Sequence, residues 1–199
     1  LKDAHVRARL VNERGDDDPS MTRRLRQWDR IFPLGTPPQY EPHPDQSIGH
    51  QAASRGMKPA ELAYDLMMEN NGRGILYRPT TNYAFGDMAP VYEMLQHPHT
   101  LIGLGDGGAH VGIMCDATDM THALTHWTRD RDRGERLPIP DIVRRLTSAN
   151  ARAIGLNDRG QIEAGMKADV NVIDYDRLAL CVPEAVSYTH LTLPTTHCV

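Results

Sequence analysis

The sequence predicts an α/β protein, and three observations support this fold class. Short apolar runs at residues 74–77 and 100–104 alternate with segments of helical period. Each run is apolar throughout, which is typical of parallel strands covered by helices on both faces. After residue 155 the pattern changes to short strand-like stretches. We therefore expect a helix-covered sheet over residues 1–155 and the start of a small β-domain over residues 156–185.

Composition argues against several classes of protein. The 199 residues carry a formal net charge of −4, with 40% apolar and 24% charged residues. This balance argues against nucleic acid as the main partner, and no apolar run approaches the ~18 residues that span a membrane. Three widely spaced cysteines predict no disulfide framework, so a reducing cytoplasm is the expected compartment. The chain begins at Leu1 without an apolar leader, and we expect a fragment of a longer protein.

The N-terminal third is predicted to contain an irregular segment and one clear helix. Residues 21–31 have the composition of a helix, and five prolines within residues 33–44 predict an extended surface segment. Pro59 is suited to the first turn of a helix, and an Asn-Asn-Gly sequence at residues 70–72 is suited to its end. One face of this helix is predicted to be apolar: Leu62, Leu66 and Met67.

Beyond residue 86, helices alternate with candidate strands. A helix is predicted from residue 87 or 88 to Pro98, and the strand at residues 100–104 runs straight into a glycine-rich loop. Further helices are predicted at residues 119–133, 140–150 and 151–155. Around a turn at Gly165, apolar residues predict short strands: Ile162, Val170, Val172 and Ile173.

Asp106 is the most informative candidate for chemistry. It follows an apolar strand and lies in the sequence Gly-Asp-Gly-Gly, whose small residues leave room for a ligand. In α/β barrels the C-terminal ends of the strands form the active site, so this carboxylate is well placed to bind a metal or move a proton. The alternative is an ordinary turn, since Asp-Gly is a common turn dipeptide. His110, four residues later, is either a substrate contact or a hydrogen-bonded loop histidine.

The other histidines are better explained as structural residues. His97 and His99 form a His-x-His pair, but they precede the predicted strand and so belong to the face opposite the expected site. Asp119, His122 and His126 share one helix face, yet the His-Glu-x-x-His motif of zinc proteases is missing. The neighbouring tryptophan indicates a packing face.

Three segments resemble a known family. Residues 102–111 (IGLGDGGAHV) look like the strand-8 aspartate motif of the amidohydrolase superfamily. Residues 146–174 resemble the junction between barrel and β-domain that is common in that superfamily. Residues 28–35 (WDRIFPLG), with Asn82, Tyr83 and the His97 segment, resemble the N-acyl-D-amino-acid deacylase (D-aminoacylase) branch.

The resemblance implies the C-terminal part of a (β/α)8 metallo-hydrolase barrel that holds zinc, followed by the start of a small β-domain. Asp106 would contact the metal or its water and act as general base, with the other ligands expected upstream of Leu1. Zinc lowers the pKa of bound water, and a nearby carboxylate can then accept its proton. A further four residues are candidate substrate contacts: Gly107, His110, Asn82 and Tyr83.

The expected activity is zinc-dependent hydrolysis of a linear amide, such as an N-acyl-D-amino acid, to a carboxylate and a D-amino acid. The alternatives are a cyclic-amide hydrolase or deaminase of the same superfamily, or a non-catalytic α/β binding domain. The expected partner is a small molecule, with neither nucleic acid nor membrane; the oligomeric state stays open. Residues 186–199 contain no Asp, Glu, Lys or Arg. Because residues 186–196 resemble a translated sequencing adaptor, we expect this tail to be an artefact.

Overall fold

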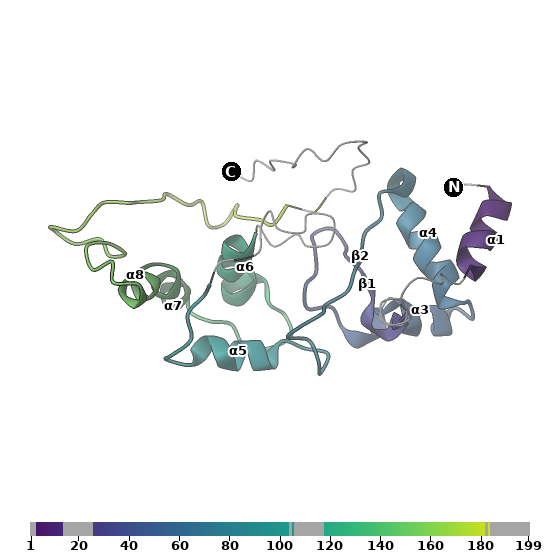
Figure 1. Cartoon of the computed structure of the whole chain (residues 1–199), viewed down its shortest axis with the longest axis horizontal. Coiled ribbons are helices and arrows are strands. Elements are labelled where there is room, and N and C mark those ends of the chain that lie inside the picture. Colours follow the sequence, from purple (N-terminus) through teal and green to yellow (C-terminus); the bar gives the residue numbers. More distant parts are fainter. Residues whose placement is uncertain (1–2, 14–25, 104, 106–117, 182, 184–199) are drawn as a thin grey trace. The chain divides into compact units, whose positions relative to one another are not determined.

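The computed structural model describes residues 3–13, 26–103, 105, 118–181 and 183 (Figure 1). These residues divide between two compact units, one within Leu1–Asp87 together with Pro183 and the other within Met88–Cys181. Helices dominate both. Within the described ranges the sheet is limited to two short strands, β1 (Phe32–Pro33) and β2 (Leu76–Tyr77).

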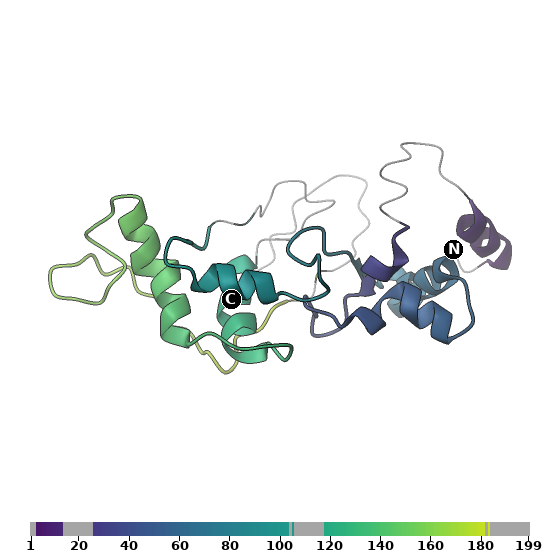
Figure 2. The ribbon, with the colours of Figure 1, turned by 90° about the horizontal axis from the view of Figure 1, so that it is seen from below.

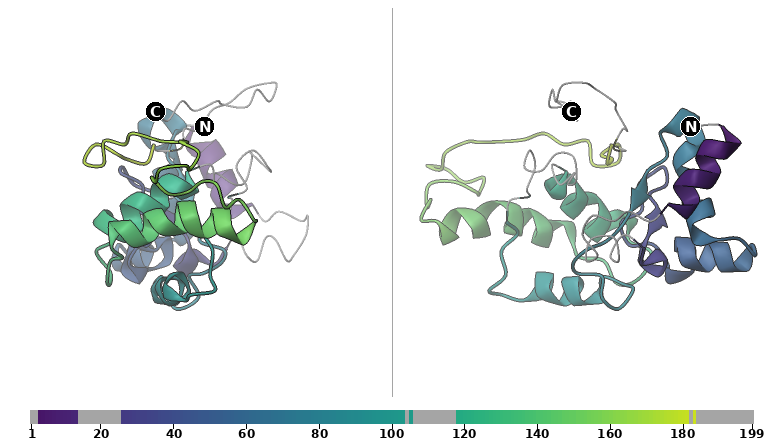
Figure 3. Two further views of the ribbon diagram at one scale, coloured as in Figure 1. Left: turned by 90° about the vertical axis from the view of Figure 1, so that its left-hand side faces the viewer. Right: turned by 45° about the vertical axis from the view of Figure 1, so that its right-hand side comes forward.

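The first unit contains helices α1 (Ala4–Asn12), α3 (Ile48–Ser54) and α4 (Pro59–Gly72) and the 3₁₀ turns η1 (Trp28–Arg30) and η2 (Pro44–Gln46). The Asp3 side chain caps α1 by accepting the His5 N–H. Arg7 on α1 pairs with Asp65 on α4 at 2.8 Å, and the two helices lie side by side (Figure 3, right).

The predicted limits of α4 are confirmed. A proline occupies its first turn, and φ values of 51°, 62° and 83° at Asn70, Asn71 and Gly72 place its last residues in the left-handed region. Asparagine and glycine tolerate that conformation better than other residues, which explains why the helix ends there. Leu62 is buried, but Met67 is 43% exposed, so the predicted apolar face included one residue too many.

The core of the first unit lies between η1, α3 and α4, and its buried members are Ile31, Ile48, Ala52, Leu62 and Ala63. The strand predicted at residues 74–77 is present as β2. It pairs antiparallel with β1, with Phe32 opposite Tyr77, so the prediction of parallel pairing is wrong for these strands. The helix predicted at residues 21–31 is also wrong where the structure describes it, because the η1 turn is followed by extended backbone. Residues 14–25 lie outside the described residues.

The second unit contains α5 (Ala89–Gln96), α6 (Asp119–Thr125), η3 (His126–Asp130), α7 (Ile139–Arg144), η4 (Arg145–Ala149) and α8 (Asn150–Ala153). The starts predicted for α5 and α6 are confirmed. The two helices predicted after residue 140 form one continuous run, α7–η4–α8 (Figure 2), in which η4 is a π-helical turn.

Trp127 lies at the centre of the second core, with Ala123, Leu137 and Ile142. The guanidinium of Arg131, which is only 2% exposed, lies 5.0 Å from the Trp127 ring and 5.4 Å from the Tyr92 ring. A Cβ at Gly134 would lie 2.8 Å from Arg131 Cζ. Glycine at residue 134 therefore allows the buried arginine to stack on both rings.

The predicted β-structure after residue 99 is not found. Residues 100–103 and 160–174 contain no strand, and Val172 is 98% exposed. A strand forms by hydrogen-bonding to a neighbour, and no described segment pairs with these two. The turn predicted at Gly165 is confirmed by its φ of 89° and by the bond of 3.1 Å from the Met166 N–H to the Glu163 carbonyl. The domain limits at residues 155 and 185 stay predictions.

No helix in the described ranges is long and apolar enough to cross a bilayer.

Candidate functional site

The structure describes the chain on both sides of the predicted catalytic loop. Asp106, Gly107 and His110 themselves lie outside the described residues. Residues 100–103 lead toward this loop, and α6 begins shortly after it. The described part of the candidate site therefore consists of these two flanking elements.

The approach to the loop is held by two side chains from the α7–η4–α8 run. Arg145, which is 7% exposed, donates from Nη1 to the Thr100 carbonyl at 3.1 Å and to the His97 carbonyl at 3.4 Å. Asn150 donates from Nδ2 to the Ile102 carbonyl at 2.8 Å. Ile102 also packs against the core around Trp127. A segment without a strand partner is thus anchored by side chains and apolar contact.

The exit from the loop leads into a histidine stack. The rings of His122 and His126 lie 4.6 Å apart and within 11° of parallel. The His126 ring meets Trp127 edge-on at 4.9 Å. This arrangement agrees with the packing role predicted for these histidines. His97 and His99 also interact with each other, with ring centroids 5.5 Å apart.

The described donors alone do not fit a zinc site. Zinc needs three or four ligands that converge on one point. Within the described ranges, no group of three or more His, Cys, Asp or Glu side chains is placed to hold a metal ion. Asp106, the one ligand predicted from this chain, is outside those ranges, so we derive no chemical step through the metal.

Asn82 and Tyr83 belong to the first unit. Tyr83 is 8% exposed, its ring meets Phe32 edge-on at 6.0 Å, and its hydroxyl donates to the Pro42 carbonyl. This tyrosine therefore fastens its own loop to β1. Asn82 is exposed and has a φ of 59°, in the left-handed region. The role of both residues as substrate contacts stays a prediction.

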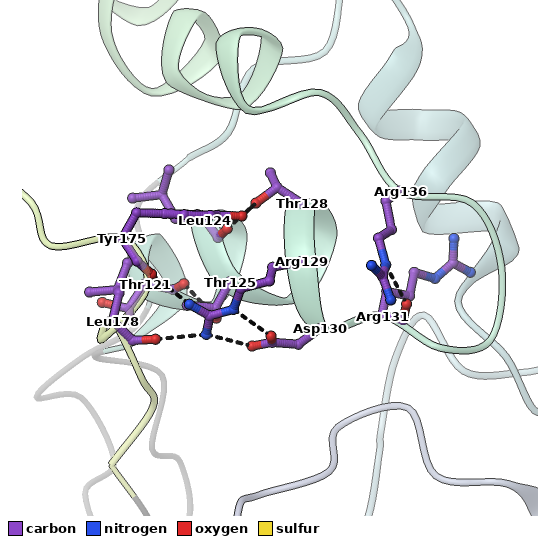
Figure 4. Close-up of polar contacts among 10 residues, drawn as sticks. All are labelled: Thr121, Leu124, Thr125, Thr128, Arg129, Asp130, Arg131, Arg136, Tyr175 and Leu178. Carbon is purple, nitrogen blue, oxygen red and sulfur yellow. Dashed lines mark hydrogen bonds and ion pairs between the residues drawn. The ribbon is translucent and has the colours of Figure 1, made fainter.

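Arg129 on η3 binds the segment that follows the predicted barrel (Figure 4). It donates to the carbonyls of Tyr175 at 2.6 Å and Leu178 at 2.7 Å, and it pairs with Asp130 at 2.6 Å. The hydrogen bond with Asp130 is the main cause that raises the pKa of Arg129. The Tyr175 hydroxyl lies 2.6 Å from Thr128 Oγ1. The Arg129 guanidinium also lies 5.3 Å from the centre of the Tyr175 ring, so residues 175–178 are fixed to η3 by backbone, ring and hydroxyl contacts.

Sequence reasoning missed the three residues that make these anchors, Arg129, Arg145 and Asn150. A signal existed for Arg145, because it follows the fully buried Ile142 by one helical turn and so falls on an apolar stripe. A charged residue on such a stripe indicates a buried charge with partners. Nothing comparable in the sequence identifies Arg129.

Comparison with known proteins decides the family. Residues 4–191 match the model described as the amidohydrolase family. The chain belongs to the amidohydrolase family. Membership implies a (β/α)8 metallo-hydrolase barrel, so the superfamily predicted from residues 102–111 and 146–174 is confirmed. The match runs to residue 191 and so includes the first residues of the segment predicted to be an adaptor artefact, and nothing supports that prediction.

Several relatives are about 30% identical to the chain over the aligned residues. A 5-methylthioadenosine/S-adenosylhomocysteine deaminase of Pelotomaculum thermopropionicum is 33% identical over 123 residues, which are 59% of this chain and 27% of the relative. A deaminase of the same name from Natronomonas pharaonis is 30% identical over 125 residues, 62% of this chain and 28% of the relative. An uncharacterized protein of Mycobacterium tuberculosis (strain ATCC 25618 / H37Rv) is 31% identical over 149 residues, 72% of this chain and 24% of the relative.

The chain therefore spans between about a quarter and 28% of the length of these relatives. No solved structure matches it.

Proposed function

We propose that the protein carrying this chain is a deaminase that hydrolyses the C–N bond of an amino-substituted ring and releases ammonia. The observation that carries the proposal is the 33% identity over 123 residues to a relative named as a 5-methylthioadenosine/S-adenosylhomocysteine deaminase. The proposed substrate class is an adenosine derivative. This replaces, as the first candidate, the N-acyl-D-amino acid predicted from sequence.

Asp106 has the central role in the proposed reaction. Its carboxylate accepts a proton from the attacking water as the water oxygen bonds to the ring carbon. It then returns that proton to the leaving nitrogen as the C–N bond breaks, so that ammonia departs. The second proton of the water moves from the oxygen to the adjacent ring nitrogen, which leaves a carbonyl. A carboxylate suits both steps because it gains and releases one proton near neutral pH when its surroundings raise its pKa. Zinc is the proposed metal, with Asp106 as one of its ligands.

Hydrolysis of an N-acyl-D-amino acid is the second candidate, and residues 28–35 favour it. Part of that resemblance has a structural explanation, because Ile31, Phe32 and Leu34 are buried in the first unit. The preceding residues 28–30 are different: they line a cavity of about 450 Å³. Trp28 also packs against the apolar core of the first unit, so Asp29 and Arg30, which are exposed, are the part of the motif that core packing does not explain.

A paired assay distinguishes the candidates. The protein as encoded, loaded with zinc, is given 5-methylthioadenosine or S-adenosylhomocysteine, and ammonia is measured. In parallel it is given N-acetyl-D-amino acids, with the L-enantiomers as control, and free amine is measured. Ammonia release supports the deaminase proposal. Release of free amine from the D-enantiomers but not the L-enantiomers supports hydrolysis of N-acyl-D-amino acids. If neither class of substrate is turned over and the protein retains no metal, the result supports a binding domain.

A further inference from the structure

We propose that the first unit contains a binding site for a small zwitterion, a molecule that carries an ammonium and a carboxylate group on an apolar body, such as a free amino acid with an aliphatic side chain. The site is the cavity of about 450 Å³ that η1 lines. This inference goes beyond the deaminase proposal and does not depend on it, so either can fail without the other.

The cavity has the size and the mixed lining of a small-molecule site. Its lining comes from η1 and the two residues before it, from Gly49 on α3 and from Pro59 at the start of α4. Small-molecule sites have volumes of roughly 300–1,000 Å³ and combine an apolar wall with a few polar groups. Trp28 supplies an apolar wall, and it is held in place because it also packs against the core of the first unit.

Two charged groups of opposite sign line this cavity side by side in the sequence. Asp29 and Arg30 are both exposed, and neither forms a hydrogen bond or an ion pair within the part of the chain that the structure describes. Adjacent charged residues do pair with each other elsewhere, at residues 129–130 and 158–159. In η1 the carboxylate and the guanidinium therefore stay available to a ligand, the first for an ammonium and the second for a carboxylate.

Gly49 makes room for the carboxylate. Its backbone is helical, where glycine is less favourable than alanine, so helix formation does not explain this residue. A Cβ at Gly49 would overlap the Asp29 Oδ1 atom and would lie 3.1 Å from the Asp29 nitrogen. The absence of a side chain on α3 thus lets the Asp29 carboxylate lie at the edge of the cavity.

The other polar groups of the lining already have partners. Arg26 donates from Nη2 to the Glu13 carbonyl at 3.0 Å, and Gln27 accepts at Oε1 from Arg78 Nη2 at 2.9 Å. Recognition therefore falls to the two unpaired charges and to the tryptophan. A ligand that lacks either charge should bind more weakly than the zwitterion, because it leaves one of the two protein charges without a partner.

Calorimetry with leucine tests the site in the protein as encoded. We expect saturable binding of L-leucine or D-leucine, and weaker binding of N-acetylleucine, which lacks the ammonium, and of 3-methylbutylamine, which lacks the carboxylate. Asp29→Asn and Arg30→Gln should each weaken leucine binding about three- to fivefold, the effect of losing one ion pair that is open to solvent. Gly49→Ala should also weaken it, because the added Cβ displaces the carboxylate.

Matched controls come from the second unit. Asp141→Asn and Arg144→Gln change exposed charges on α7 and should leave leucine binding unchanged. Asp29→Asn and Arg30→Gln alter exposed side chains and should keep the wild-type melting temperature, so they test the site even if Gly49→Ala unfolds the unit. Leucine should also change the tryptophan fluorescence of the wild type but not of Trp28→Phe, since Trp127 is buried in the other unit.

The outcomes separate the inference from the proposed function. Leucine binding that weakens in the Asp29 and Arg30 variants and not in the controls supports the inference, whatever the enzyme assay shows. No saturable binding of leucine by the wild type overturns it, as does equal affinity in all variants. Equal binding of leucine and N-acetylleucine overturns it too, because the Asp29 carboxylate then recognises no ammonium.

Discussion

The two units stabilise irregular backbone in different ways. In the first unit the core cluster is apolar and Glu41 is the buried charged residue among those described, while the ion pair between Arg7 and Asp65 is at the surface, with side chains 35% and 47% exposed. In the second unit two arginines are buried, Arg131 at 2% and Arg145 at 7% exposure. Arg145 donates to backbone carbonyls of another segment, and Arg131 donates to the nearby Glu135 carbonyl at 2.9 Å.

The difference indicates where the second unit depends on side chains in place of secondary structure. A buried guanidinium supplies several directed donors, and Arg145 uses them on a segment that pairs with no strand among the described residues. The approach to the candidate catalytic loop is such a backbone segment. Local changes to polar side chains should therefore have large effects in the second unit and small effects on the surface of the first.

The largest effect is expected at the candidate base. Asp106→Asn in the protein as encoded is nearly isosteric but removes the charge that accepts the proton, so kcat should fall at least ~10²-fold. Steady-state assay of the zinc-loaded variant measures this. Asp141→Asn, an exposed carboxylate at the start of α7, is the matched control. Near-normal turnover of Asp106→Asn would remove this residue from the mechanism.

Among the stability variants, removal of the Trp127 ring should lower the free energy of unfolding of the second unit most. Trp127 is 4% exposed and contacts both the apolar core and Arg131. Trp127→Ala should lower the free energy of unfolding by about 3–5 kcal/mol, as expected for deletion of a large core side chain. Denaturant titration measures the loss. Phe85→Ala, at a ring that is 81% exposed in the first unit, should change stability by less than about 0.5 kcal/mol. Equal effects of the two variants would contradict this description of the core.

Two glycines separate backbone strain from steric clash. Gly134 and Gly56 both have positive φ, but a Cβ meets the Arg131 guanidinium at Gly134 and nothing within 4 Å at Gly56. Gly56→Ala should therefore cost about 1 kcal/mol of stability from strain alone. Gly134→Ala should cost about 2–4 kcal/mol, because it adds a clash with a buried group. The same cost at both positions would show that Arg131 moves aside freely.

A pH effect is expected at Tyr92 in the second unit. Its hydroxyl donates to the Glu135 carboxylate at 2.9 Å, and this bond, followed by burial, raises its pKa above the ordinary 10.0. Since the folded state favours the protonated phenol, its contribution to stability is complete below the ordinary pKa and is lost as pH rises through the raised pKa. Tyr92→Phe should therefore show a flatter alkaline dependence of unfolding than the wild type. Superimposable alkaline profiles would exclude a role for this hydrogen bond.

The smallest effect is expected at the surface of the first unit. Arg7 hydrogen-bonds Asp65, which is the main cause of its raised pKa. Both side chains are open to solvent, where such pairs contribute little. Arg7→Met should leave the thermal midpoint unchanged within error, in contrast to Arg145→Met. A clear drop for Arg7→Met would mean that the first unit also depends on directed polar contacts.

The sequence predicted best those features that depend on local chemistry. Pro59 and the residues Asn70, Asn71 and Gly72 set the limits of α4 because each acts on its own backbone. The turn at Gly165 was found for the same reason. The strands predicted at residues 100–104 and 160–174 are not found over their described parts, residues 100–103 and 160–174, because a strand needs a partner, which local composition does not specify. The helix predicted at residues 21–31 is wrong at residues 28–30, where the structure has the η1 turn.

The candidate site was predictable only in part. The motif around Asp106 identified the superfamily, since the family match covers it. The anchors Arg129, Arg145 and Asn150 bind backbone carbonyls about 45 or more positions away in the chain. Contacts over such a separation depend on the tertiary fold, so helical spacing indicates that Arg145 is buried but does not indicate which carbonyls the three side chains bind.

Release of ammonia tests the central claim most directly, namely that the protein carrying this chain is a deaminase that acts through Asp106. The zinc-loaded protein as encoded and its Asp106→Asn variant are given 5-methylthioadenosine, and the ammonia that each releases is measured. The account predicts ammonia release by the wild type and a loss of at least ~10²-fold in the variant. Equal release by both proteins, or release of free amine from N-acetyl-D-amino acids in place of ammonia, would contradict it.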